Sequence, residues 1–204
     1  MGLLSLEHGQ TAYRADFALY GAAVVLLALL LLRSPPGTML GELACVLSGA
    51  IAWTLIEYGL HRFVLHGLQP FKAWHAAHHR RPTALIGLPT LLSATLFASL
   101  VFAPAWGASN LWLASGLTLG VLIGYLAYAI THHATHHALV GRGAAFASWL
   151  GPWLGRRRRW HALHHRHLDH PVCFGVTSAF WDHLFGSRHP LDVSATGDGH
   201  RGGR

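Results

Sequence analysis

Apolar residues form four long runs in the first two thirds of the chain, separated by short stretches of Pro, Gly and polar residues. The runs predict membrane-spanning helices at about residues 17–32, 39–60, 85–103 and 111–130, because a helix needs about 17–25 mostly apolar residues to cross a bilayer. A turn is expected between the last two, from Pro104 to Asn110. No later run is long enough to cross. The pattern therefore predicts an all-α integral membrane protein with two membrane hairpins followed by a polar segment.

The first run has a second interpretation, as the core of a signal peptide behind Arg14. No small-residue cleavage site precedes Arg33, and the Pro35-Pro36-Gly37 stretch that follows is typical of a tight turn. A membrane span is therefore favoured.

Composition supports a membrane location. Hydrophobic residues make up 52% of the chain and charged residues 11%, whereas about a quarter of an ordinary soluble domain is charged. The formal net charge of +7 does not favour nucleic-acid binding, since the basic residues flank apolar runs and so fit a membrane surface better. Cys45 and Cys173 lie far apart and form no disulfide framework or thiolate metal motif.

The basic residues also predict the orientation of the chain. With four spans, both termini and the middle loop lie on one side, and of 15 Lys and Arg residues only Arg33 falls on the other. Because positive charge remains cytoplasmic, the first side is predicted to be the cytosol. We expect the inner membrane of a bacterium, given the Ala-, Gly- and Arg-rich usage, or the endoplasmic reticulum if the source is eukaryotic.

The predicted organisation is one membrane-embedded domain over residues 1–189. Segments 61–84 and 131–189 are expected to form a helical cap on the cytosolic side, and residues 190–204 a flexible tail. The basic run at residues 156–159 is interpreted as a contact with anionic lipid, or alternatively as a docking surface for an acidic electron donor.

Histidine is the unusual residue, with 18 His against 8 Asp plus Glu. Ten of them fall into four clusters, mostly at spacings of three or four residues that share one helix face. Every cluster lies on the predicted cytosolic side, and ten imidazoles are about enough for two metal ions. The pattern therefore predicts a dimetal site in the cap. Its predicted ligands are His61, His66, His75, His78, His79, His132, His136, His161, His164 and His165.

Imidazole alone does not choose between iron, zinc, copper and nickel, but the scarcity of carboxylates excludes a Glu-rich soluble di-iron bundle. Nearby polar residues are predicted to hold the ligating rings by hydrogen bonds, with a structural role as the alternative for Glu57. These are Glu57, His137, Asp169 and Asp182. Aromatic residues near the clusters are candidates for lining a substrate slot, and an interfacial aromatic belt is the alternative for each. They are Tyr58, Trp74, Tyr128, Trp160 and Trp181.

The clusters resemble the histidine boxes of the fatty acid hydroxylase superfamily. Residues 57–66 (EYGLHRFVLH), 75–79 (HAAHH), 131–137 (THHATHH) and 160–165 (WHALHH) are similar to its four boxes in order. Residues 174–186 resemble the closing segment of the branch that 2-hydroxylates sphingolipid fatty acids. The resemblance covers about residues 55–187.

The resemblance implies a four-helix membrane fold with a cytosolic cap, in which the ten box histidines bind two iron ions. Zinc can occupy the same imidazoles in a purified sample. It also implies that dioxygen and two electrons are used to hydroxylate or desaturate a C–H bond in a lipid acyl chain, with fatty acid or ceramide 2-hydroxylation expected. Because no haem domain precedes the first span, a separate donor protein or reductase is expected to supply the electrons.

Several alternatives stay open at this point. The short stretch between His66 and His75 is more similar to sterol-desaturase or carotenoid-hydroxylase relatives. A membrane metal transporter or metal-binding protein is a different class, but transport sites tend to lie near the bilayer midplane, not beyond the span ends. A two-haem cytochrome needs His within the spans, and a zinc hydrolase needs three ligands, not ten. A lipid hydroxylase is the favoured interpretation.

Overall fold

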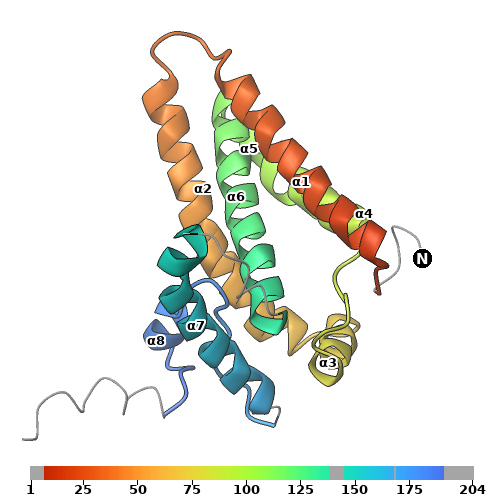
Figure 1. The fold of residues 1–204 in the computed structure, drawn as a ribbon. Coiled ribbons are helices and arrows are strands. Elements are labelled where there is room, and N and C mark those ends of the chain that lie inside the picture. Colours follow the sequence, from red (N-terminus) through yellow and green to blue (C-terminus); the bar gives the residue numbers. More distant parts are fainter. Residues whose placement is uncertain (1–6, 138–144, 168, 191–204) are drawn as a thin grey trace, which may run out of the picture. The chain divides into compact units, whose positions relative to one another are not determined.

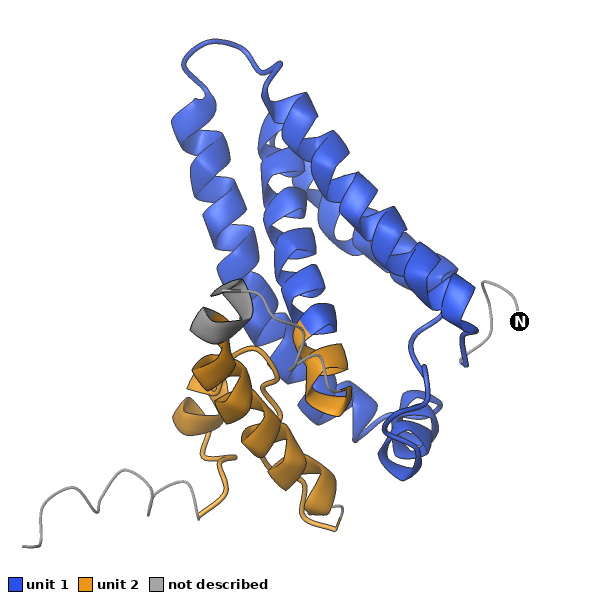
Figure 2. Cartoon of the chain, in the orientation of Figure 1, with its two compact units in different colours: residues 1–130 blue, residues 131–204 orange. Residues whose placement is uncertain are grey.

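The computed structural model describes residues 7–137, 145–167 and 169–190, and the regular elements in these ranges are helices. An isolated bridge between Glu7 and Ile86 is the β-type pairing seen there. The chain divides into two compact units, residues 1–130 and 131–204 (Figure 2), which are described separately below.

The first unit is a set of long apolar helices with one short helix at its end (Figure 1). In order they are α1 (Gln10–Leu31), α2 (Met39–Gly59) with a π-helical continuation at Leu60–Leu65, α3 (Phe71–Arg80), α4 (Thr90–Phe97), a second π-helical segment at Ala98–Phe102, α5 (Ala103–Ala108) and α6 (Leu111–His136). Helix α3 lies at the end of the unit away from the loop between α1 and α2 (Figure 1).

Four membrane spans are confirmed by the length and composition of these helices. The candidates are Gln10–Leu31, Met39–Leu65, Thr90–Ala108 and Leu111–His136. Large apolar side chains are exposed along them, for example Leu26 at 66%, Leu40 at 79% and Leu100 at 69%. Exposed leucines recur along the first three spans, and Ile123 and Ile130 are exposed on the fourth. Such apolar surfaces are unfavourable in water and favourable against lipid tails. The chain is an integral membrane protein.

The third span differs from its predicted bounds of 85–103. Residues 85 and 86 lie outside the helix: the His8 amide donates to the Leu85 carbonyl (2.9 Å), and Ile86 pairs with Glu7. The helix therefore begins only at Thr90, after Pro89. Pro104 was expected in the turn, but it lies inside the continuous helical span Thr90–Ala108, just after the π-helical segment Ala98–Phe102.

Helices α2 and α6 approach closely through glycines. A Cβ added to Gly120 would meet the Val46 carbonyl oxygen, and one added to Gly49 would meet the Leu117 carbonyl oxygen. Lipid tails are as apolar as Leu, so close packing between backbones is a main source of helix association in a membrane. These glycines therefore fix the α2–α6 pair.

An aromatic cluster joins the four spans in the interior of the first unit. Tyr125 of α6 lies 4.8 Å from Tyr20 of α1, 5.4 Å from Trp53 of α2 and 5.1 Å from Phe97 of α4, between ring centroids. The Tyr20 hydroxyl also hydrogen-bonds the Ser93 hydroxyl at 2.6 Å. Edge-to-face rings at these distances stabilise the packing beyond area burial.

The second unit consists of the last turns of α6, helix α7 (Ala145–Arg166), a loop, and the short helix α8 (Phe180–Leu184) (Figure 2). Its described core contains the buried side chains of Trp160, Cys173, Phe174 and Val176. The predicted tail lies almost wholly outside the described residues. Whether segments 61–84 and 131–189 form one cap stays a prediction.

Candidate metal centre

The first two histidine boxes lie at the end of α2 and on α3. The Nε2 atom of His75 is 3.0 Å from Nε2 of His61 and 3.0 Å from Nε2 of His79. One nitrogen atom from each of His61, His66, His75 and His79 can be chosen so that all four lie within 4.8 Å of one another. The structure therefore brings four of the five predicted ligands of this unit together. His78 is buried beside them, with its ring stacked 5.7 Å from that of His75.

His61 and His66 share a face because the helix between them is π-helical. Their spacing of five residues does not match the 3.6-residue turn of an α-helix, so a regular α-helix would not place them on the same face. Residues Leu60–Leu65 instead form a π-helical turn, in which residues five apart align. The two ring centroids are 5.4 Å apart.

The third and fourth boxes form a second cluster, on α6 and α7. Nε2 of His161 is 2.8 Å from Nε2 of His136 and 3.1 Å from Nε2 of His165. The ring of His132 packs 4.8 Å from that of His161. Nitrogen atoms of His136, His161 and His165 lie within 4.8 Å of one another. This unit thus also gathers its predicted ligands.

The remaining ring of this cluster, His164, is fully buried and fixed by the backbone. Its Nδ1–H donates to the Val172 carbonyl at 2.8 Å. A hydrogen bond at one ring nitrogen sets the tautomer and leaves the lone pair on the other nitrogen, which is the usual arrangement of a metal-binding imidazole.

Burial favours the neutral form of two of these imidazoles, His66 and His161. It lowers the pKa of His66 to about 4, with a smaller contribution from the nearby charge of Lys72. It also lowers the pKa of His161 well below its ordinary value, and neighbouring imidazoles such as His132 and His165 add to this effect. Neutral imidazole is the form that binds a metal ion, so near neutral pH these two rings need not lose a proton first.

The spacing of the nitrogen atoms fits a metal ion. Each cluster has one Nε2 atom with two Nε2 neighbours at 2.8–3.1 Å. With metal–nitrogen bonds of about 2.0–2.1 Å, two ligands at a right angle would lie about 2.9 Å apart. A single N–H between two rings explains one such contact, but three rings converging at this spacing match a coordination shell.

Asp182 was predicted to hydrogen-bond a ligating imidazole, but its hydrogen-bond partners are of other kinds. Its fully buried carboxylate accepts from the N–H groups of Phe174 and Gly175 and the hydroxyl of Ser187, each at 2.8 Å, and from the Trp160 indole at 3.4 Å. Burial raises the pKa of Asp182, and the four hydrogen bonds oppose this change. The carboxylate therefore orders the loop before α8 and holds the residue that precedes His161.

The other predicted supporting residues lie in three different settings. Glu57 is buried on α2, one turn before His61. The ring of His137 stacks on that of His133 at 4.2 Å, while Asp169 is exposed. A role in orienting ligating rings stays a prediction for Glu57 and His137, and the exposure of Asp169 gives it no support.

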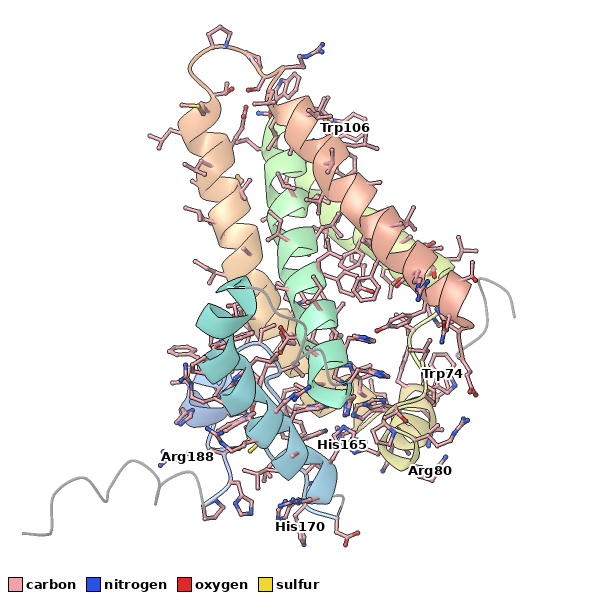
Figure 3. All side chains as sticks on the ribbon, in the orientation of Figure 1. Trp74, Arg80, Trp106, His165, His170 and Arg188 are labelled. Carbon is pink, nitrogen blue, oxygen red and sulfur yellow. The ribbon has the colours of Figure 1, made fainter. Side chains whose placement is uncertain are left out.

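The predicted substrate-lining aromatics are spread over both units, and their role stays a prediction. In the first unit, Tyr58 is buried and its hydroxyl accepts a hydrogen bond from Arg62, Tyr128 packs 6.2 Å from Trp53, and Trp74 packs on Phe71 of α3, at the opposite end of the unit from Trp106 (Figure 3). In the second unit, Trp160 is buried and stacks on His183, and Trp181 packs on Phe180 and Phe185.

Two features of the structure were missed by sequence reasoning. The aromatic cluster around Tyr125 draws one residue from each of four spans, and its only sequence signal is an aromatic residue within each apolar run. The basic run at 156–159 was treated as one surface, but Arg158 donates two hydrogen bonds within the protein.

Comparison with known proteins decides the family. The family model for fatty acid hydroxylase matches residues 46–187. The chain belongs to the fatty acid hydroxylase family. All four histidine boxes and the loop before α8 fall inside the matched region.

Similar proteins carry related names. The chain is 35% identical over 166 residues to the ceramide very long chain fatty acid hydroxylase SCS7 of Saccharomyces cerevisiae, covering 71% of this chain and 37% of that protein. It is 29% identical over 155 residues to the dihydroceramide fatty acyl 2-hydroxylase FAH2 of Arabidopsis thaliana, covering 72% and 61%. The chain thus spans less than two thirds of the length of these relatives.

A solved structure shares the fold. Full-length scs7p, in which only the hydroxylase domain is visible, matches with a TM-score of 0.73 at 24% sequence identity, covering 92% of this chain and 69% of that one. The predicted all-α membrane fold is confirmed by this match and by the four candidate spans.

Proposed function

We propose that this chain hydroxylates an unactivated C–H bond in a lipid acyl chain, at two iron ions bound by the ten box histidines. The observation that carries the proposal is the convergence of imidazole nitrogens in each unit, at 2.8–3.1 Å and with no carboxylate in either group. Imidazole donors suit iron, and family membership supports hydroxylation.

We propose a fatty acyl group of ceramide or a related lipid as the substrate, with hydroxylation at carbon 2. The support is that relatives at 29–35% identity are named for ceramide or dihydroceramide acyl hydroxylation. The names of these relatives do not favour the sterol or carotenoid alternative. Membership of a hydroxylase family likewise does not favour the metal-transport alternative.

Iron supplies, with dioxygen as co-substrate, the oxidising power that amino-acid side chains lack. The residues of the chain prepare its site. Neutral rings such as His66 and His161 offer lone pairs without first losing a proton. The hydrogen bond from His164 to Val172 fixes one ring orientation, and Asp182 orders the loop that packs behind that ring. The exposed apolar faces of the spans suit a substrate that arrives through the bilayer.

The electrons are proposed to come from a separate donor protein or reductase on the cytosolic side. The support is the distribution of charge, since the basic residues concentrate on the predicted cytosolic face with the histidine boxes. Dioxygen and electrons would then reach the metal ions from the cytosol, and lipid from the membrane.

Mass spectrometry of lipid extracts tests the proposal. Cells expressing the wild type are compared with cells expressing a His78→Ala/His79→Ala double variant, with iron and a reductase supplied in both. His170→Ala is the matched control, because His170 is exposed and lies outside the boxes. A ceramide class that gains one oxygen with the wild type and the control, but not with the double variant, supports the proposal. A class that loses two hydrogens indicates a desaturase, and no difference between the extracts refutes an oxidising enzyme.

A further inference from the structure

The four arginines at residues 156–159 have different environments. Arg156 and Arg159 are exposed, and the Arg157 guanidinium lies over the ring of Trp160, 5.5 Å from its centroid. Arg158 is half-buried. Its Nε–H donates to the Ala134 carbonyl at 2.9 Å, and its Nη2–H donates to the His137 carbonyl at 2.7 Å.

The two carbonyls that Arg158 contacts belong to the end of α6. The last four carbonyls of an α-helix have no partner within the helix, and this end carries a partial negative charge. A guanidinium suits such a site, because its planar fork presents several N–H groups in fixed directions and always keeps its charge. Arg158 thus holds the turn of α6 that carries His136.

The same face of α7 carries two of the histidines. Arg158, His161 and His165 are spaced by three and four residues, so they lie along one side of the helix. His161 faces His136 of α6 with 2.8 Å between the Nε2 atoms. One face of α7 therefore contacts the backbone of α6 through Arg158 and an imidazole of α6 through His161.

We propose that Arg158 is a positioning residue that fixes the end of α6 against α7 and thereby sets the spacing of the third and fourth histidine boxes. The inference rests on the proposed function of these boxes as metal ligands. Both hydrogen bonds of Arg158 go to main-chain carbonyls and not to a ligand ring. Arg158 acts on the main chain that carries His132 and His136. Loss of a group that orients metal ligands without binding the metal typically costs about 10–100-fold in metal affinity.

The first test uses the metal-free, full-length protein. Hydrogen exchange is measured for the α6 amides of residues 131–137 in the wild type, Arg158→Ala, Arg156→Ala and Arg159→Ala. We expect faster exchange at these amides only in Arg158→Ala, with the amides of α2 unchanged. Equal exchange in all four proteins overturns the inference, and this result does not depend on whether the protein is an enzyme.

The second test titrates the same proteins with Co²⁺ and follows the visible absorption of the bound ion. We expect the wild type and both control variants to bind two ions tightly. In Arg158→Ala, one ion should bind about 10–100-fold more weakly and the other as before. General misfolding would weaken both. Arg158→Lys keeps the charge but loses the fork, so it should recover only part of the lost affinity.

These measurements separate the two proposals. If the wild type binds fewer than two Co²⁺ ions, the two-metal proposal fails, and the exchange data alone decide the role of Arg158. If the wild type binds two ions and Arg158→Ala binds both as tightly, the two-metal proposal stands and the role of Arg158 is refuted.

Discussion

Replacing Asp182 with Asn should loosen the loop before α8 by an amount that the structure allows us to work out. The Oδ1 atom accepts from Phe174 N–H and the Ser187 hydroxyl, and Oδ2 accepts from Gly175 N–H and the Trp160 indole. In the Asn variant, the amide oxygen can take the place of Oδ2 and still accept from the Gly175 N–H and the Trp160 indole. The NH₂ group then takes the place of Oδ1 and can donate to the Ser187 hydroxyl. The N–H of Phe174 then has no acceptor.

A buried N–H that loses its acceptor costs about 1–3 kcal/mol, and the remaining bonds also lose their charge-assisted character. We therefore expect the substitution to lower the free energy of loop opening by about 2 kcal/mol. Since 1.4 kcal/mol corresponds to a tenfold change in an equilibrium constant, the open population of the loop should rise about 30-fold.

The thiol of Cys173 reports this opening, because it lies in the same loop, is fully buried, and its backbone N–H donates to the Ser187 carbonyl at 2.8 Å. In a Cys45→Ala background it is the single thiol, so labelling with a maleimide measures loop opening alone. Where the labelling rate is proportional to reagent concentration, it follows the open population. We expect Asp182→Asn to label about 30-fold faster than the wild type.

Asp169→Asn is the matched control, because Asp169 is exposed. In this variant, Cys173 should label at the wild-type rate. A rate for Asp182→Asn within twofold of this control would refute the reasoning, because it would mean that the four hydrogen bonds do not hold the loop closed.

Three further predictions concern packing, pH and metal. Gly120→Ala should destabilise the α2–α6 pair by about 1–3 kcal/mol, because the added Cβ meets the Val46 carbonyl. Gly21→Ala in α1 meets nothing and should not lower Tm in detergent; equal Tm values for both variants would contradict the packing argument. Burial raises the pKa of Asp182, so the folded chain retains that proton at a pH where the unfolded chain has lost it. Stability should therefore fall as pH rises from about 4 through the raised pKa, and Asp182→Asn should lack this slope in a pH series of Tm. Removing bound metal with a chelator should lower Tm, and Zn²⁺ at a hundred times its Kd should restore about 2.7 kcal/mol. A Tm insensitive to chelation would argue against a structural coupling of metal and fold.

Hydropathy predicted the existence and order of the four spans, because a bilayer requires long apolar helices whatever their neighbours. It failed at the start of the third span, where Ile86 pairs with Glu7 and the helix begins only at Thr90. That pairing joins residues almost eighty positions apart, which no local pattern can report.

The histidine clusters were predictable because spacing of three or four residues is a local property of a helix. The supporting contacts were not. Asp182 was expected to hold an imidazole, but it binds a loop whose backbone N–H groups have no signature in the sequence. Arg158 is likewise indistinguishable in sequence from its exposed neighbours, because its partners are main-chain carbonyls of another helix.

The π-helical turn between His61 and His66 has a consequence for comparing this chain with its relatives. Each residue inserted into an α-helix rotates everything after it by about 100°, since one turn takes 3.6 residues. A π-helical turn absorbs one extra residue without that rotation, so His66 returns to the face of His61. A relative with one residue fewer between its two histidines could therefore reach the same ring placement through a regular α-helical turn. A one-residue gap in an alignment at this point would then record a change of helix type, with both ligands retained.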